Sequence, residues 1–178
     1  MFRQFRVVDD EVVVFASGDP LFFGFANTIQ REIPDVEMQV FPYFNSLQLL
    51  AHRLLMPYQE MHVVSLTGRP WLTFAEALII GYDMVGVLTD NRVHTPSAIA
   101  QRMLEYGYDN YEMYVGELLG NHDKEKVTKW RIEEVVGQDF DYPNNIILRR
   151  TAVHPRPFGV PESGFHLLNG RAKMITKM

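Results

Sequence analysis

A short turn with one glycine and one carboxylate follows the most apolar run in the first part of the chain. The run covers residues 12–15, and the turn is Ser17-Gly18-Asp19-Pro20. Consecutive β-favouring residues predict a buried strand near 11–16 in a parallel sheet, and such sheets bind ligands at the carboxyl ends of their strands. Gly18 would let backbone amides approach a ligand, and Asp19 would accept hydrogen bonds. In the alternative interpretation, Asp19 only caps the helix that follows.

Composition limits the kinds of site that this turn can belong to. The chain has 178 residues, of which 47% are hydrophobic and 22% charged, and this predicts one soluble domain or two small lobes. Because cysteine is absent, disulfides, thiolate zinc sites and cysteine nucleophiles are excluded. The six histidines lack metal-ligand spacing, which predicts no metal site. A net charge of -5 argues against nucleic acid as the main partner.

The chain also lacks the apolar segments that membrane proteins and secreted proteins carry. No apolar run approaches the length of a membrane helix, and no apolar core with a small-residue cleavage site follows the first residues. We therefore expect a cytoplasmic protein without a membrane partner.

Strand and helix patterns alternate along the chain, which predicts an α/β fold with crossover connections. Two helix starts are well marked, because Asn45 precedes an apolar stripe, and Thr95 is followed by Pro96. A turn at residues 65–70 predicts a hinge between two lobes. We expect strands near 11–16, 36–41, 61–66, 84–88, 111–115 and 144–149, and helices at 22–32, 46–55, 72–80, 96–106 and 131–136.

Five short motifs follow one another in a fixed order between residues 10 and 150. They are Ala-Ser-Gly-Asp-Pro at 16–20, Phe-Pro-Tyr-Phe-Asn-Ser-Leu-Gln at 41–48, Ser-Leu-Thr-Gly-Arg at 65–69, Leu-Thr-Asp at 88–90 with Thr-Pro at 95–96, and Val-Gly-Glu-Leu-Leu-Gly at 115–120. Their order and spacing resemble the tetrapyrrole (corrin and porphyrin) methyltransferase family, specifically its precorrin-6Y C5,15-methyltransferase (decarboxylating) branch. Tyr43 departs from the pattern, because relatives usually have glycine there.

The resemblance implies a two-lobed α/β fold, with S-adenosylmethionine held in the cleft between the lobes, and a homodimer. It further implies C-methylation of a precorrin tetrapyrrole in cobalamin biosynthesis. Because the acceptor carbon is already electron-rich, no side-chain nucleophile is required and no catalytic residue is assigned. The positions that correspond to the family's cofactor contacts are Ser17, Gly18, Asp19, Phe22, Asn45, Ser46, Thr89 and Leu119.

Charged side chains are the candidates for contact with the carboxylate-rich substrate. Arg69 is the preferred one, because a guanidinium group binds a carboxylate through two hydrogen bonds. Arg53 is a further candidate, whereas the helical pattern around Arg102 favours a helix-face role. Glu117 is the second predicted substrate contact, and capping of the next turn is its alternative role.

The resemblance also implies a division of the chain into three parts. Residues 1–64 would be the remainder of an N-terminal lobe with the cofactor loop, residues 65–150 the C-terminal lobe, and residues 151–178 a linker and the start of a decarboxylating methyltransferase domain. The family's first strand and Gly-Pro-Gly loop would precede residue 1. We therefore expect an incomplete first lobe that binds cofactor weakly and is inactive alone.

Two other functions stay open at this point. One is a methyltransferase of the same fold that acts on uroporphyrinogen or ribosomal RNA. The other is a catalytically inert scaffold or dimerisation fragment.

Overall fold

The computed structural model describes residues 11–153 of the chain. They form a mixed α/β fold with a five-stranded sheet of order β1-β2-β5-β3-β4. The strands are β1 (His62–Ser65), β2 (Met84–Leu88), β3 (Tyr111–Glu117), β4 (Lys126–Arg131) and β5 (Asn144–Arg150). The predicted α/β class is confirmed. The sheet is mixed and not parallel, because in the described residues β1 and β2 pair in parallel and the other pairs are antiparallel.

The helices agree with the pattern in the sequence. They are α2 (Phe25–Glu32), α3 (Ser46–Arg53), α4 (Leu72–Ile80), α5 (Pro96–Glu105) and α6 (Ile132–Val135). Both marked starts are confirmed. The Asn45 side chain accepts a hydrogen bond from Gln48 N, and the Gln48 side chain accepts one from Asn45 N, which forms a capping box. Thr95 accepts a hydrogen bond from Ala98 N, and Pro96 is the first residue of α5.

Helices cover both faces of the sheet, and β5 shows how the two faces alternate. Ile146 and Leu148 are buried against the core formed with α4, α5 and α6. Ile147 points to the opposite face, where it is buried with Leu47 and Leu50 of α3. Because successive side chains of a strand point to opposite faces, Asn145 belongs to the α3 face. This face carries the site described below.

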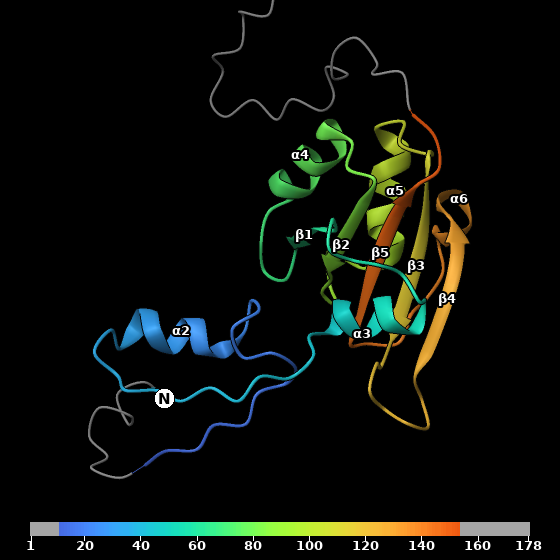
Figure 1. Cartoon of the computed structure of the whole chain (residues 1–178). Coiled ribbons are helices and arrows are strands. Elements are labelled where there is room, and N and C mark those ends of the chain that lie inside the picture. Colours follow the sequence, from blue (N-terminus) through green and yellow to red (C-terminus); the bar gives the residue numbers. More distant parts are fainter. Residues whose placement is uncertain (1–10, 154–178) are drawn as a thin grey trace, which may run out of the picture.

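The segment before α3 differs from this body. The predicted strands near 11–16 and 36–41 are wrong, since neither range is paired with another strand in the described residues. Side chains that the pattern placed in a core are exposed, at 70% for Val13 and 96% for Phe15. Figure 1 shows α2 and the chain on either side of it reaching away from the sheet. An apolar run forms a strand only where a neighbour satisfies its backbone groups.

Two further differences concern the sheet. Strand β4 was not predicted, because it is an edge strand with charged residues at Lys126, Lys129 and Arg131, which weaken an apolar pattern. Strand β1 spans the expected division between residues 64 and 65, and it pairs with β2. The expected linker and following domain lie almost entirely outside the described residues.

Candidate functional site

The chain turns sharply at the first predicted cofactor loop. Gly18 has a φ of +71°, a conformation that favours glycine. Asp19 Oδ1 accepts a hydrogen bond from Leu21 N at 2.9 Å and closes a turn. α2 begins only after Gly24, where a Cβ would lie 2.3 Å from the Pro20 carbonyl oxygen. The alternative role of Asp19 as a helix cap is therefore wrong, and the loop depends on glycine at two points.

The start of α3 lies directly beside this loop. A Cβ on Gly18 would lie 3.5 Å from the Phe44 carbonyl oxygen and 3.8 Å from Cα of Asn45. Asn45 is 8% exposed, because its side chain is held in the capping box. Two turns that are distant in the sequence thus form one continuous wall.

The ends of three neighbouring strands form the floor below this wall. Leu88 of β2 pairs with Asn145 of β5, which pairs on its other side with Gly116 of β3. A Cβ on Gly116 would lie 2.8 Å from Leu119 Cδ1 and 3.2 Å from Asn145 Oδ1. Glycine at position 116 therefore leaves room for the Leu119 and Asn145 side chains at the end of the sheet.

The wall and floor enclose one hollow of about 240 Å³. Its lining combines the glycine turn, the polar start of α3 and the strand ends with the loop that follows β3. A mainly apolar surface with a few placed polar groups is typical of a small-molecule site.

Seven of the eight residues predicted to contact the cofactor line this hollow. They are Ser17, Gly18, Asp19, Phe22, Asn45, Ser46 and Leu119. The eighth, Thr89, is 3% exposed, and its Oγ1 lies 2.5 Å from the carbonyl oxygen and 2.7 Å from Oδ1 of Asn144. Because Asn144 lines the hollow, Thr89 supports the wall from behind and does not face its interior.

Sequence reasoning missed the part of the lining that strand ends supply. These residues are Leu88, Gly116, Pro143, Asn144 and Asn145. The available signal was the Pro-Asn-Asn sequence directly before an apolar strand, since polar residues at strand ends often line ligand sites.

Arg69, the preferred candidate for substrate binding, lies at the rim of the hollow. Its guanidinium carbon is 5.0 Å from the ring centroid of Phe23, which is itself part of the lining. Arg69 is exposed, so the contact with the ring holds the charge beside the hollow in a solvated position.

The other two arginines are engaged elsewhere. Arg102 lies over the ring of Trp71, with 4.7 Å between the guanidinium carbon and the ring centroid. Arg53 forms an ion pair with Glu125, whose Oε2 also accepts a hydrogen bond from Gly120 N at 2.7 Å. The hydrogen bond from Arg53 holds the pKa of Glu125 below its ordinary value. This pair ties the end of α3 to the loop that carries Leu119.

Glu117, the second predicted substrate contact, is buried to 2% exposure. Its Oε1 accepts a hydrogen bond from Asp141 N at 2.8 Å, and its Oε2 lies 3.4 Å from Lys126 Nζ. The carboxylate therefore fixes the chain segment that leads into β5. Neither contact is with the turn directly after Glu117, so the alternative capping role is not observed, and the substrate contact stays a prediction.

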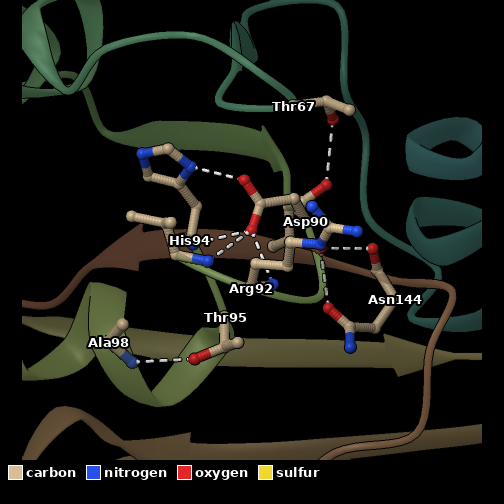
Figure 2. A network of polar contacts seen from close by, with 9 residues as sticks. Thr67, Asp90, Arg92, His94, Thr95, Ala98 and Asn144 are labelled. Atoms are coloured by element: carbon tan, nitrogen blue, oxygen red, sulfur yellow. Dashed lines mark hydrogen bonds and ion pairs between the residues drawn. The ribbon is translucent and has the colours of Figure 1, made fainter.

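The loop after β2 forms a polar network that the sequence did not predict (Figure 2). Asp90 Oδ1 accepts hydrogen bonds from the backbone amides of Arg92, Val93 and His94 at 2.8 to 2.9 Å, and Oδ2 lies 2.6 Å from His94 Nδ1. Burial by itself would raise the pKa of the Asp90 carboxyl. The hydrogen bonds from His94 and from the two other amides outweigh burial and hold this pKa well below its ordinary range.

The same region connects three segments behind the hollow. Thr67 Oγ1 donates a hydrogen bond to the Thr89 carbonyl oxygen at 2.9 Å, and the Thr89 hydroxyl contacts Asn144 (Figure 2). The loop after β1, the end of β2 and the start of β5 are thereby held together. In residues 11–153, no group of three or more His, Asp or Glu side chains is placed to hold a metal ion. No helix in the same part of the chain is long and apolar enough to cross a membrane.

The sequence profile of the Tetrapyrrole (Corrin/Porphyrin) Methylases matches residues 4–136. The chain belongs to this family. The resemblance that the five motifs predicted is therefore confirmed at the level of the tetrapyrrole methylases.

Two curated relatives carry the names of precorrin and cobalt-precorrin methyltransferases. The chain is 32% identical over 118 residues to a precorrin-6Y C(5,15)-methyltransferase [decarboxylating] of Sinorhizobium sp. This alignment covers 66% of the present chain and 28% of the relative. The chain is 26% identical over 140 residues to the cobalt-precorrin-7 C(5)-methyltransferase of Salmonella typhimurium. This alignment covers 79% of the present chain and 67% of the relative.

A solved tetrapyrrole methylase shares the fold. It is the uroporphyrin-III C-methyl transferase of Thermus thermophilus complexed with S-adenyl homocysteine, with a TM-score of 0.54 and 25% identity. The match covers 74% of this chain and 60% of the solved chain. The present chain thus spans a little over a quarter of the first curated relative and about three fifths of the solved one.

Proposed function

We propose that the chain binds S-adenosylmethionine in the hollow and serves the C-methylation of a precorrin in cobalamin biosynthesis. The observation that carries the proposal is the gathering of the glycine turn, the start of α3 and Leu119 around one hollow. Two curated relatives are named as methyltransferases of precorrin-6Y and cobalt-precorrin-7, and a solved family member is complexed with S-adenyl homocysteine.

The chemistry of the lining fits this cofactor. At Gly18 the positive φ lets the loop turn beside the start of α3, and at Gly116 the missing side chain makes room for Leu119 and Asn145 to line the hollow. Asp19, Asn45 and Ser46 form a polar side suited to the amino-acid end of the cofactor, and Leu88 with Leu119 forms an apolar side suited to a flat ring. When bound, the cofactor supplies an electrophilic methyl group on a sulfonium.

Orientation is the main task of the chain's own residues in this reaction. The hollow holds the donor at a fixed position, and Arg69 at the rim binds a carboxylate of the tetrapyrrole in a matching position. Such alignment can lower a barrier by about 7 to 11 kcal/mol in favourable model systems. No proton-transferring side chain is assigned.

Uroporphyrinogen is the second candidate substrate. It is supported by the solved uroporphyrin-III methyltransferase at 25% identity, whereas two curated relatives support a precorrin. The homodimer, the associated decarboxylating domain and the cytoplasmic location also stay proposals. The exposed apolar side chains of Phe15 and Phe41, at 96% and 75%, are consistent with a covered surface in an assembly.

Calorimetric titration with S-adenosylhomocysteine tests the proposal, and it also tests the predicted weakness of binding. Gly18→Val places a branched side chain in a backbone conformation that disfavours it, next to Phe44, and should weaken binding at least tenfold. Gly107→Val is the matched control, because Gly107 has a φ of +78° and no atom within 4 Å of an added Cβ.

The proposal would be contradicted if the unmodified chain did not bind S-adenosylhomocysteine, or if Gly18→Val and Gly107→Val lost the same amount of affinity. Methyl transfer from labelled cofactor to a precorrin or to uroporphyrinogen, measured side by side, then separates the two substrates. Binding of S-adenosylhomocysteine without transfer to either substrate agrees both with the predicted inactivity of the chain alone and with the scaffold function.

A further inference from the structure

The floor of the hollow contains one buried side-chain amide without a partner. Asn145 is 2% exposed, and neither its Oδ1 nor its Nδ2 has a hydrogen-bond partner. Buried polar groups are nearly always hydrogen-bonded, so an amide with both ends unpaired requires an explanation.

The surroundings of Asn145 do not supply a partner, because they are largely apolar. Its strand neighbours on the two sides are Leu88 and Gly116. A Cβ added to Gly116 would lie 3.2 Å from Asn145 Oδ1, 2.8 Å from Leu119 Cδ1 and 3.0 Å from Leu50 Cδ1. The two leucine side chains therefore lie close to the amide. Leucine at position 145 would suit these neighbours better, which indicates that the amide serves something other than packing.

Asn145 and three of these neighbours line the same hollow. Asn145, Leu88, Gly116 and Leu119 all contribute to its lining. Both amide atoms are buried, and the half-buried Leu119 side chain lies close to them, so contact with a ligand in the hollow requires this side chain to move. A ligand group that fits this position needs hydrogen-bonding atoms on an apolar frame.

We propose that Asn145 is a specificity-determining residue whose side-chain amide pairs with the adenine ring of the cofactor. This inference rests on the proposed function. An asparagine amide presents an acceptor beside a donor, and adenine presents an amino donor beside a ring-nitrogen acceptor, so the two form a pair of parallel hydrogen bonds.

The other parts of the cofactor match the amide less well. The carboxylate of the amino-acid end only accepts hydrogen bonds and its ammonium only donates them, so each alone would leave one amide atom unpaired, and a sulfonium forms none with either amide atom. Ribose hydroxyls could pair with the amide, but the leucine side chains at positions 88 and 119 suit the faces of a flat ring. The polar side at Asp19 and Ser46 is left for the amino-acid end.

The test compares two ligands on the 178-residue chain by calorimetric titration. One is S-adenosylhomocysteine, and the other is its analogue with unsubstituted purine, which lacks the amino donor but keeps the ring-nitrogen acceptors. The unmodified chain should prefer the adenine ligand roughly 10- to 100-fold, as expected for a bidentate pair. A ratio of affinities is measured, so a uniformly weak site lowers both affinities without changing the expected preference.

Asn145→Leu should reduce this preference to less than about threefold and should raise the melting temperature of the unliganded chain, since an unpaired buried amide is removed. Asn145→Ala covers the case in which leucine does not fit. Asn110→Ala is the matched control, because Asn110 has an unpartnered Oδ1 at the opposite end of the β3–β5 pair and is remote from the hollow.

The outcomes separate this inference from the proposed function. If the unmodified chain binds neither ligand, the proposed function and the role of Asn145 are both contradicted. If it binds S-adenosylhomocysteine but shows no preference for the amino group, or if the preference survives in both Asn145 variants, the role of Asn145 is wrong and the cofactor site stands. If Asn145 pairs with the ribose hydroxyls instead, the chain should bind S-adenosylhomocysteine without a preference for the amino group.

Discussion

The body of the molecule and the segment before α3 use similar apolar residues in opposite ways. In the body, Val85 and Val87 of β2 are fully buried between two paired strands. In the segment, Val13 is 70% exposed, although it lies in an equally apolar run. The comparison shows that an apolar run sets the tendency of a chain to form a strand, while the presence of neighbouring strands decides whether it becomes one.

The two regions also contribute differently to the hollow. The body supplies a floor of strand ends, which the hydrogen bonds of Thr67 and Thr89 connect from behind. The segment supplies a wall whose shape depends on local turns at Gly18 and Gly24. Substitutions in the body away from the lining of the hollow should therefore act mainly on folding, and substitutions in the turns of the segment mainly on ligand binding.

Valine-to-alanine substitution in each region gives the largest expected contrast. Val85→Ala should lower the free energy of unfolding by about 2 to 3 kcal/mol, because it removes buried methyl groups and leaves a cavity. Val13→Ala should change it by less than about 0.5 kcal/mol. Urea denaturation measures both. Similar losses for the two variants would mean that residues near 13 are buried in solution.

A buried carboxylate tests whether the polar loop after β2 belongs to the stable body. Asp90→Asn should lower the free energy of unfolding by about 2 kcal/mol at pH 7, because the charged acceptor of three amides and His94 is lost. Asp123→Asn is the control, since Asp123 also pairs with a neighbouring histidine but its side chain is 91% exposed. It should show no measurable change.

The pH dependence of the Asp90 effect has a definite sign. The pKa of Asp90 is lowered in the folded chain, so its contribution is fully present well above the ordinary value of 3.8 and is lost as pH falls through and below that value. The difference between wild type and Asp90→Asn should therefore be constant from about pH 6 to 8 and shrink below about pH 4. A difference that grew on acidification would contradict this assignment.

A glycine of the segment tests the opposite side of the comparison. Gly24→Ala should weaken binding of S-adenosylhomocysteine by about tenfold, because a Cβ 2.3 Å from the Pro20 carbonyl oxygen forces the turn to open. The melting temperature should stay within about 1 °C, since few buried contacts depend on this turn. Unchanged affinity with a clear loss of stability would reverse the roles assigned to the two regions.

Local signals predicted the helices well, whereas the sheet required information that the sequence does not carry locally. Asn45 and Thr95 mark helix starts through hydrogen bonds within four residues, so the pattern is sufficient. Strands depend on distant partners. This is why the runs near 11–16 and 36–41 were overestimated and the charged edge strand β4 was missed.

The candidate site shows the same division. Residues of the motifs, such as Gly18 and Ser46, could be assigned through the family resemblance, and they line one hollow. Asn145 could not, because its importance depends on cross-strand pairing with Leu88 and Gly116 and on the absence of any hydrogen-bond partner. Thr89 was assigned by its place in a motif, but its hydroxyl is directed to Asn144.

Asn45 stands at the junction of the two regions and gives the smallest but most specific prediction. Asn45→Ala removes the cap of α3 and should lower the free energy of unfolding by about 1 kcal/mol. Thr95→Ala removes the equivalent cap of α5, which does not border the hollow, and should cost about the same. The two variants should differ in affinity for S-adenosylhomocysteine, with a loss of several-fold for Asn45→Ala alone. If Asn45→Ala and Thr95→Ala bind S-adenosylhomocysteine equally well, Asn45 acts only as a helix cap. Loss of either cap would then lower stability without changing the ligand site.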